Sequence, residues 1–206
     1  MLVRQPGLSA IGELVGEPPH RPRRGPKRKK LVERREDIPA GAFPDYWCEV
    51  LPHLRQSYGH LCAYLAMRIH PATGMGTVDH FIPKSAAWDK VYEWSNYRLS
   101  CALVNTCKGS TILPLDPFTL PDGLCALEFV AFQVKPGSTA AGAMEAVVDH
   151  MINDVLHLND RLCCELRRTY FDDYMSGDLS LAILERDAPF IAMELRRQGM
   201  LRPGDS

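Results

Sequence analysis

The sequence predicts an α+β fold in which a small strand–strand–helix unit is embedded in a mainly helical domain. First, the run MGTVDHFI alternates as a short strand does. Second, YRLSC is typical of another short strand and is followed directly by the helical segment ALVNTCKGS. Third, apolar residues in the C-terminal half recur at intervals of three and four, which indicates an amphipathic helix.

The charge is spread unevenly along the 206 residues. Formal net charge is −1, but the run Arg21–Arg35 carries nine Lys or Arg residues against one Glu, so the remainder is acidic on balance. Such a run indicates either an arm that binds nucleic acid or another polyanion, or a solvated tail. The arm residues that we expect to contact nucleic acid are Arg23, Arg24, Lys27, Arg28, Lys29 and Lys30.

Hydrophobic residues make up 46% of the chain, which is enough for a packed core. We expect no transmembrane helix, because no stretch approaches 18 apolar residues, and no signal peptide in the first twenty residues. The seven cysteines are odd in number and two are adjacent, so we expect reduced thiols in a cytoplasmic protein.

We divide the chain into a basic N-terminal arm (1–37), a core (38–115) and a helical C-terminal region (116–206). In the arm, a short helix is expected near Leu8–Val15. Helical spacing at Trp47, Val50, Leu51 and Leu54 predicts the first core helix. The two strands follow, joined by a loop or short helix over AAWDKVYEWSN, and the next helix is expected to begin at a Ser100 cap and end at Gly109.

The C-terminal region begins with the turn-rich segment TILPLDPFTLPDG. LCALEFVAFQV is then strand-like, and a final helical region is expected near Leu179–Gly199. Between them we predict one long amphipathic helix, whose apolar stripe consists of Met144, Val148, Met151, Val155, Leu158 and Leu162.

Asp79 and His80 stand side by side just after a short apolar run and three residues before Pro83. Asp79 is a hard carboxylate of the kind that metal ions prefer, and His80 titrates near neutral pH. An isolated Asp-His pair is more often a surface or hydrogen-bonded core feature, so its chemistry depends on what accompanies it.

VDHFIPKS, WSNYRLSC and NTCKGS, in this order, resemble the core of HNH nucleases, the ββα-metal motif. The matching positions are Asp79, His80, Asn96 and Asn105, with Lys108-Gly109 after them, and the nine-residue spacing between the two asparagines is typical of the family. The resemblance implies a metal-dependent endonuclease that hydrolyses phosphodiester bonds in DNA, in which Asp79 and Asn105 bind the metal, His80 is the general base and Asn96 orients the loop or the histidine.

The chemistry of phosphodiester hydrolysis fits these residue types. It requires an activated water and a group that absorbs developing negative charge, which a neutral imidazole and a divalent cation supply. A carboxylate oxygen and an amide oxygen, completed by waters and a phosphate oxygen, suit Mg²⁺, with Mn²⁺ as the substitute.

Strand and helix geometry set the expected directions of these side chains. Neighbouring strand residues face opposite sides, so Asp79 would face the helix and metal while His80 faces the substrate. Asn105 and Lys108 share a helix face, which would bring Lys108 to the bound phosphate. Lys84 and Arg98 are further candidates for backbone contacts with nucleic acid.

Many HNH domains hold a structural zinc with two Cys-x-x-Cys pairs, and this chain keeps one cysteine of each pair. Leu65 and Val104 occupy the partner positions of Cys62 and Cys101. A tetrahedral Cys₄ site needs four thiolates, so we expect apolar packing in place of zinc. The alternative is a replacement zinc site made of Cys62, Cys101, Cys107 and His60.

A finer resemblance extends over most of 43–168 through the segments LDPF and LHLND. It points to the HNH proteins of bacterial antiphage systems, of the Septu type and associated with retrons, which commonly work with an ATPase of the ATP-binding-cassette type. This chain has no Gly-x-x-x-x-Gly-Lys-Ser/Thr loop, so the resemblance implies that ATP hydrolysis belongs to a partner. The C-terminal helices are the candidate docking surface.

Two alternatives remain open from the sequence. The chain could be a catalytically silent subunit that binds nucleic acid, although intact Asp79, His80, Asn96 and Asn105 argue against loss of activity. It could also cut RNA, such as a tRNA loop, because the ββα-metal element contacts the phosphate backbone more than the bases.

Overall fold

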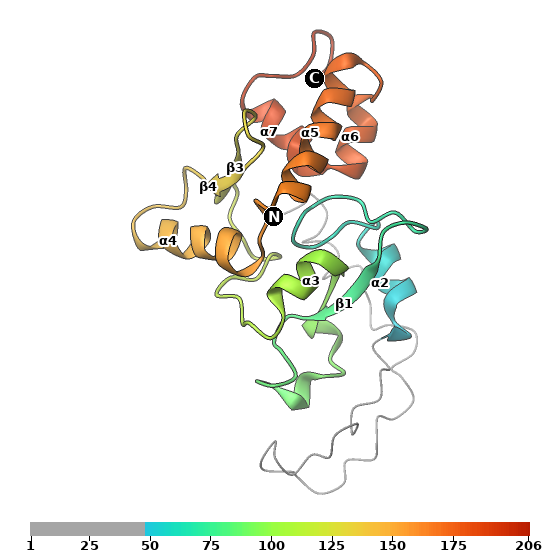
Figure 1. The fold of residues 1–206 in the computed structure, drawn as a ribbon, viewed down its shortest axis with the longest axis vertical. Helices are drawn as coiled ribbons and strands as arrows, with labels where there is room; N and C mark the ends of the chain where they lie inside the picture. Colours follow the sequence, from blue (N-terminus) through green and yellow to red (C-terminus); the bar gives the residue numbers. More distant parts are fainter. Residues whose placement is uncertain (1–47) are drawn as a thin grey trace, which may run out of the picture.

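The structure is a computed structural model that describes residues 48–206. The expected helix at Leu8–Val15, the basic arm and Trp47 lie outside these residues. Within them the fold is α+β, with short helices around two small antiparallel sheets. Figure 1 shows the first sheet with helices α2 and α3, and the second sheet beside helix α4.

The predicted strand–strand–helix unit forms. Strand β1 (Gly76–His80) pairs antiparallel with β2 (Tyr97–Cys101), with Asp79 opposite Arg98 and His80 opposite Tyr97. Helix α3 (Ala102–Lys108) follows β2 without a loop. The helix before this unit, α2 (Leu51–Ser57), has Pro52 in its first turn, where a missing N–H is harmless.

The start and end of α3 test the two predicted helix signals. Ser100 is not the cap, because it belongs to β2 and the N-cap position falls on Cys101, which makes no capping bond with its side chain. The Ser100 hydroxyl instead donates to the Cys101 carbonyl at 3.1 Å. Gly109 does end the helix, with a φ of +51° that favours glycine.

The connection between β1 and β2 contains the 3₁₀ turns η3 (Trp88–Lys90) and η4 (Trp94–Asn96), in agreement with the loop or short helix expected there. Before β1, Leu61–Arg68 forms a tight turn that we call the hook, closed by a bridge between its two ends. The Ala63 N–H donates to the Leu99 carbonyl at 2.8 Å, which fixes the hook against β2.

The strand expected over LCALEFVAFQV is instead a hairpin of β3 (Cys125–Leu127) and β4 (Val134–Pro136). The Glu128 carboxylate accepts backbone N–H groups of the intervening loop, so a side chain replaces the strand ladder there.

The prediction of a single long helix is also wrong. Helix α4 (Ala143–His150) continues into a π-helical turn, η5 (Met151–Val155), and helix α5 (Arg161–Ser176) begins only after a loop. In that loop His157 has a φ of +51°, which a helix cannot accommodate. Most of the predicted stripe is buried, but Met144 and Leu162 are exposed.

The last helical region is two helices, α6 (Leu181–Asp187) and α7 (Pro189–Arg197), divided at Ala188 because Pro189 cannot continue α6. Asp187 connects α6 to the hook, since its carbonyl accepts the Arg68 N–H at 2.7 Å and its carboxylate lies 3.3 Å from the Arg68 guanidinium.

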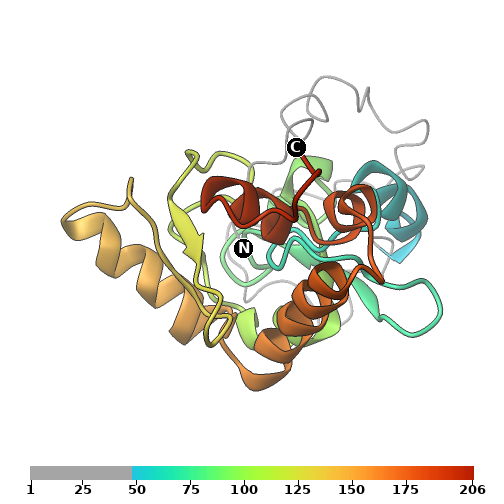
Figure 2. The same ribbon diagram turned by 90° about the horizontal axis from the view of Figure 1, so that it is seen from above.

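Buried hydrophobic residues from both halves of the described chain form one cluster. In Figures 1 and 2, α4 and the β3–β4 hairpin lie on the side of the molecule opposite α2. No helix within 48–206 combines the length and apolar character needed to cross a membrane.

Candidate functional site

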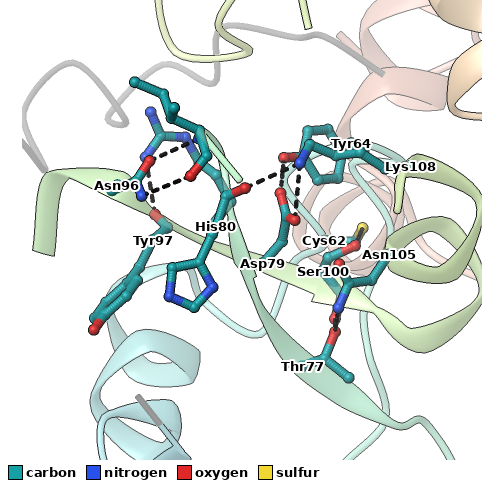
Figure 3. Close-up of polar contacts among 12 residues, drawn as sticks. Cys62, Tyr64, Thr77, Asp79, His80, Asn96, Tyr97, Ser100, Asn105 and Lys108 are labelled. Atoms are coloured by element: carbon teal, nitrogen blue, oxygen red, sulfur yellow. Dashed lines mark hydrogen bonds and ion pairs between the residues drawn. The ribbon is translucent and has the colours of Figure 1, made fainter. Parts of the chain in front are cut away.

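Asp79 and His80 occupy the last two positions of β1, and their side chains point to opposite sides of the strand (Figure 3). This is the geometry expected for neighbouring residues of a regular strand. Asp79 faces α3 and is 4% exposed, while His80 faces the β1–β2 connection and is 8% exposed. The two side chains therefore have separate partners.

The His80 imidazole is fixed by the backbone of the connection. Its Nε2 lies 2.9 Å from the Val91 carbonyl oxygen, which can only accept, so Nε2 carries the proton and Nδ1 carries the lone pair of the neutral ring. The ring also contacts Tyr97 edge-on, at 5.3 Å between centroids. Burial lowers the pKa of His80 below 6.5, because a protonated ring would lose its hydration.

Asn96 clamps the two ends of the same connection. Its Oδ1 accepts the Ile82 N–H at 2.7 Å, and its Nδ2 donates to the carbonyls of Ile82 at 3.0 Å and Lys90 at 3.2 Å. Lys90 directly precedes Val91, whose carbonyl holds the histidine. Asn96 therefore acts on His80 through the backbone and does not touch the ring through any of these bonds.

Asp79 is held by two buried donors. The Lys108 ammonium lies 3.0 Å from Oδ1, and the Tyr64 hydroxyl donates to Oδ2. Lys108 also donates to the His80 carbonyl at 3.0 Å, so it ties α3 to the end of β1. Burial, reinforced by the nearby Asp79 charge, raises the pKa of Tyr64 well above 10, which keeps the phenol protonated as a donor.

Asn105 contacts Thr77, two residues before Asp79 on β1. Its Nδ2 donates to Thr77 Oγ1 at 3.0 Å, and its side chain is half-buried. Thr77 and Asp79 share a face of the strand and lie about 7 Å apart along it. Asp79 and Asn105 are thus neighbours on the β1–α3 interface, but each is bound to its own partner.

The donor chemistry of this pair fits a hard divalent cation such as Mg²⁺. The bond from Asn105 Nδ2 leaves its amide oxygen as the liganding end, and each Asp79 oxygen can accept more than the one bond described. The Lys108 charge opposes the fit, because it already neutralises the carboxylate.

Arg98 and Lys108 have structural contacts in place of the predicted contacts with nucleic acid. Arg98 is 5% exposed, pairs with Asp116 at 2.5 Å and lies over the rings of Phe81 and Phe118. Lys108 is fully buried. Neither reaches solvent where a phosphate could approach, whereas Lys84 is exposed on the connection and stays a candidate.

Three partners of the site were missed by sequence reasoning: the Tyr64 phenol, the Val91 carbonyl and the Asp116 carboxylate. Tyr64 lies in the hook 15 residues before Asp79. A backbone carbonyl has no residue type that a motif could reveal. Asp116 lies in the LDPF segment, which the finer resemblance included but to which it gave no role.

Within residues 48–206, no three His, Cys, Asp or Glu side chains gather closely enough to hold a metal ion. The alternative zinc set of Cys62, Cys101, Cys107 and His60 is therefore not assembled in the described chain. A pair formed by one carboxylate and one amide, such as Asp79 and Asn105, is outside this criterion.

Comparison with known proteins adds no family to these observations: no protein-family model matches the chain, and neither does any curated protein.

Proposed function

We propose that this chain is a metal-dependent endonuclease of the HNH type that hydrolyses phosphodiester bonds in DNA. The observation that carries the proposal is the hydrogen bond between His80 Nε2 and the Val91 carbonyl. It fixes the tautomer and direction of an imidazole that adjoins a buried carboxylate in sequence, as a general base requires.

In this proposal Nδ1 of His80 takes the proton from the attacking water. A base must be unprotonated, and burial favours the neutral ring by lowering the pKa of His80. Asn96 contributes by holding the connection that carries Val91, so the imidazole keeps its direction while it gains and loses a proton. When bound at Asp79 and Asn105, a divalent cation would stabilise negative charge on the phosphate.

The biological setting is proposed from the sequence resemblance: an effector nuclease of an antiphage system that works with an ATPase of the ATP-binding-cassette type. Exposed apolar side chains on the C-terminal helices are compatible with a docking surface. Leu162, Leu166 and Met175 of α5 are 58%, 41% and 44% exposed. Such residues can be covered by a partner.

The test is cleavage of supercoiled plasmid by the purified chain, alone and with its neighbouring gene products, in Mg²⁺ or Mn²⁺. We expect nicked and linear DNA, and a rate lower by about 10²–10⁴-fold in His80→Ala. His53→Ala is the matched control, because His53 is exposed on α2. Equal rates in His80→Ala and wild type would refute the proposal, and a parallel assay on total RNA separates DNA from RNA cleavage.

A second candidate, a silent subunit that binds nucleic acid, is favoured by one observation. Both Asp79 oxygens are engaged, one by the Lys108 ammonium and one by Tyr64, so a cation must share the carboxylate with a fixed positive charge. This candidate predicts salt-dependent plasmid binding without cleavage, with or without a partner and in either metal.

A further inference from the structure

A small cavity adjoins the hook on the side of helix α5. Its volume is about 290 Å³, and its wall is mostly apolar, with Leu65 and Leu166 among its residues. Three thiols also line it: Cys62 of the hook, Cys101 at the junction of β2 and α3, and Cys163 of α5. All three are unbridged. A cavity of this size can admit water and small solutes but not a macromolecule.

Cys62 and Cys101 are in direct contact. The Cys101 N–H donates to Cys62 Sγ at 3.4 Å, which brings the two cysteines side by side. The hook places Cys62 for this contact, because its N–H donates to the Met67 carbonyl at 3.0 Å and its carbonyl accepts the Ala66 N–H at 2.9 Å. Two thiols from segments 39 residues apart are thus held together by the fold.

The surroundings of Cys62 favour its thiolate. Burial raises the pKa of a thiol, but bonds from the Cys101 thiol and from the N–H groups of Leu65, Cys101 and Tyr64 outweigh burial and lower the pKa of Cys62 to about 6. Cys163 provides an internal comparison, since it lines the same cavity but its burial raises its pKa. The cavity therefore contains one thiol prepared as a nucleophile and one in contact that can resolve it.

We propose that Cys62 and Cys101 are a peroxide-sensitive dithiol that closes into an intramolecular disulfide. The oxidant is of the hydroperoxide class, small enough to enter the cavity. The proposal does not depend on nuclease activity, because it rests on the N–H···S contact between Cys101 and Cys62 and on the cavity that both thiols line.

The reaction proceeds in two displacements. The Cys62 thiolate attacks one peroxide oxygen, the O–O bond breaks, and the leaving oxygen takes a proton to become water while Cys62 becomes a sulfenic acid. Cys101 sulfur then attacks Cys62 Sγ, the S–S bond forms, the S–O bond breaks, and the displaced hydroxyl leaves with the Cys101 proton as a second water. Two thiols and one hydrogen peroxide give one disulfide and two waters.

The experiment treats the full-length chain with hydrogen peroxide, blocks remaining thiols under denaturing conditions and digests with trypsin. Cleavage after Arg55, Arg68, Arg98 and Lys108 releases peptide 56–68, whose only cysteine is Cys62, and peptide 99–108, which holds Cys101 and Cys107. The proposed disulfide would link these two peptides. We expect this cross-linked peptide to accumulate, and to disappear on reduction and in Cys101→Ser.

Cys107→Ser is the matched control, because it leaves one cysteine in the second peptide and should keep the cross-link. The proposal is overturned if Cys62 remains alkylatable at peroxide levels that oxidise the exposed Cys48, or if Cys62 proceeds to a sulfinic acid without a cross-link. It is likewise overturned if Zn²⁺ alone binds at one equivalent and both Cys62→Ser and Cys101→Ser abolish that binding. Because the wild-type chain carries the decisive measurement, a variant that fails to fold does not decide the result.

Discussion

Asp79 and His80 are adjacent in β1 and both buried, but their electrostatic surroundings differ. The Asp79 carboxylate has a counter-charge, the Lys108 ammonium at 3.0 Å, and Tyr64 donates to its other oxygen. His80 Nε2 bonds to the Val91 carbonyl, and burial lowers the pKa of the ring, which favours its neutral form. One residue is thereby paired with a buried counter-charge and the next is held as a neutral ring, which the proposed general base needs.

The lowered pKa of His80 predicts the pH dependence of cleavage. Burial is the main cause and the positive charge of Lys84 adds to it, while the bond to Val91 opposes both. Because the base must be unprotonated, the rate should fall as pH drops, with a midpoint below the ordinary value of about 6.5. Initial rates measured between pH 4.5 and 8 test this, and a midpoint above 6.5 would contradict it.

The ion pair between Lys108 and Asp79 predicts an effect on stability. Lys108→Met leaves a buried carboxylate without its counter-charge, so the free energy of unfolding should fall by about 3–5 kcal/mol in urea titrations. Lys90→Met, at an exposed lysine, should change it by less than about 0.5 kcal/mol.

The double variant Asp79→Asn/Lys108→Met should recover part of that stability, since it leaves no unpaired charge. If Mg²⁺ binds at Asp79, it should raise the melting temperature of Lys108→Met more than that of wild type. Equal stability of Lys108→Met and wild type would show that the pair contributes little.

At the scale of elements, side-chain bonds fix the β1–β2 unit both within its connection and to the segment that follows α3. Asn96 ties the ends of the connection together, and Arg98 ties β2 to the segment that follows α3 through Asp116. The arginine also lies 4.4 Å from the Phe118 ring centroid. These contacts make Arg98 a packing residue of the unit.

Arg98→Met tests that assignment against the predicted contact with nucleic acid. It removes charged hydrogen bonds, so the free energy of unfolding should fall by about 2 kcal/mol, measured by urea denaturation. The salt dependence of plasmid binding should stay unchanged. Lys84→Met, which removes an exposed charge, should instead reduce that slope by up to about 1 with little loss of stability.

The elements that were predicted correctly are those whose signal is local. Alternation in MGTVDHFI and the glycine at 109 mark β1 and the end of α3. The long helix failed because its interruption depends on a distant partner: Asn159 leaves the helix and bonds both Val134 N and Val134 O of β4, at 2.8 and 2.9 Å. Periodicity alone cannot reveal such a contact.

At the scale of the whole molecule, the contrast between local signals and distant contacts also explains which features of the candidate site could be predicted. The sequence identified Asp79, His80, Asn96 and Asn105, and the structure brings them to one β1–α3 unit and its connection. The sequence did not reveal that Lys108 would form a buried ion pair with Asp79. The two residues are 29 positions apart, and burial is a property of the completed fold. The direction of a lysine side chain follows from packing, which spacing does not specify.

The Asp187–Arg68 link has a mechanical consequence. Asp187 of α6 bonds to Arg68, and Arg68 belongs to the hook, which also contains Cys62 and Tyr64. A ligand that shifted the C-terminal helices by even a fraction of a turn would pull on that loop of chain, and through the Tyr64 phenol on the carboxylate at the end of β1. A chain of contacts therefore joins α6 to the Asp79 carboxylate through the hook.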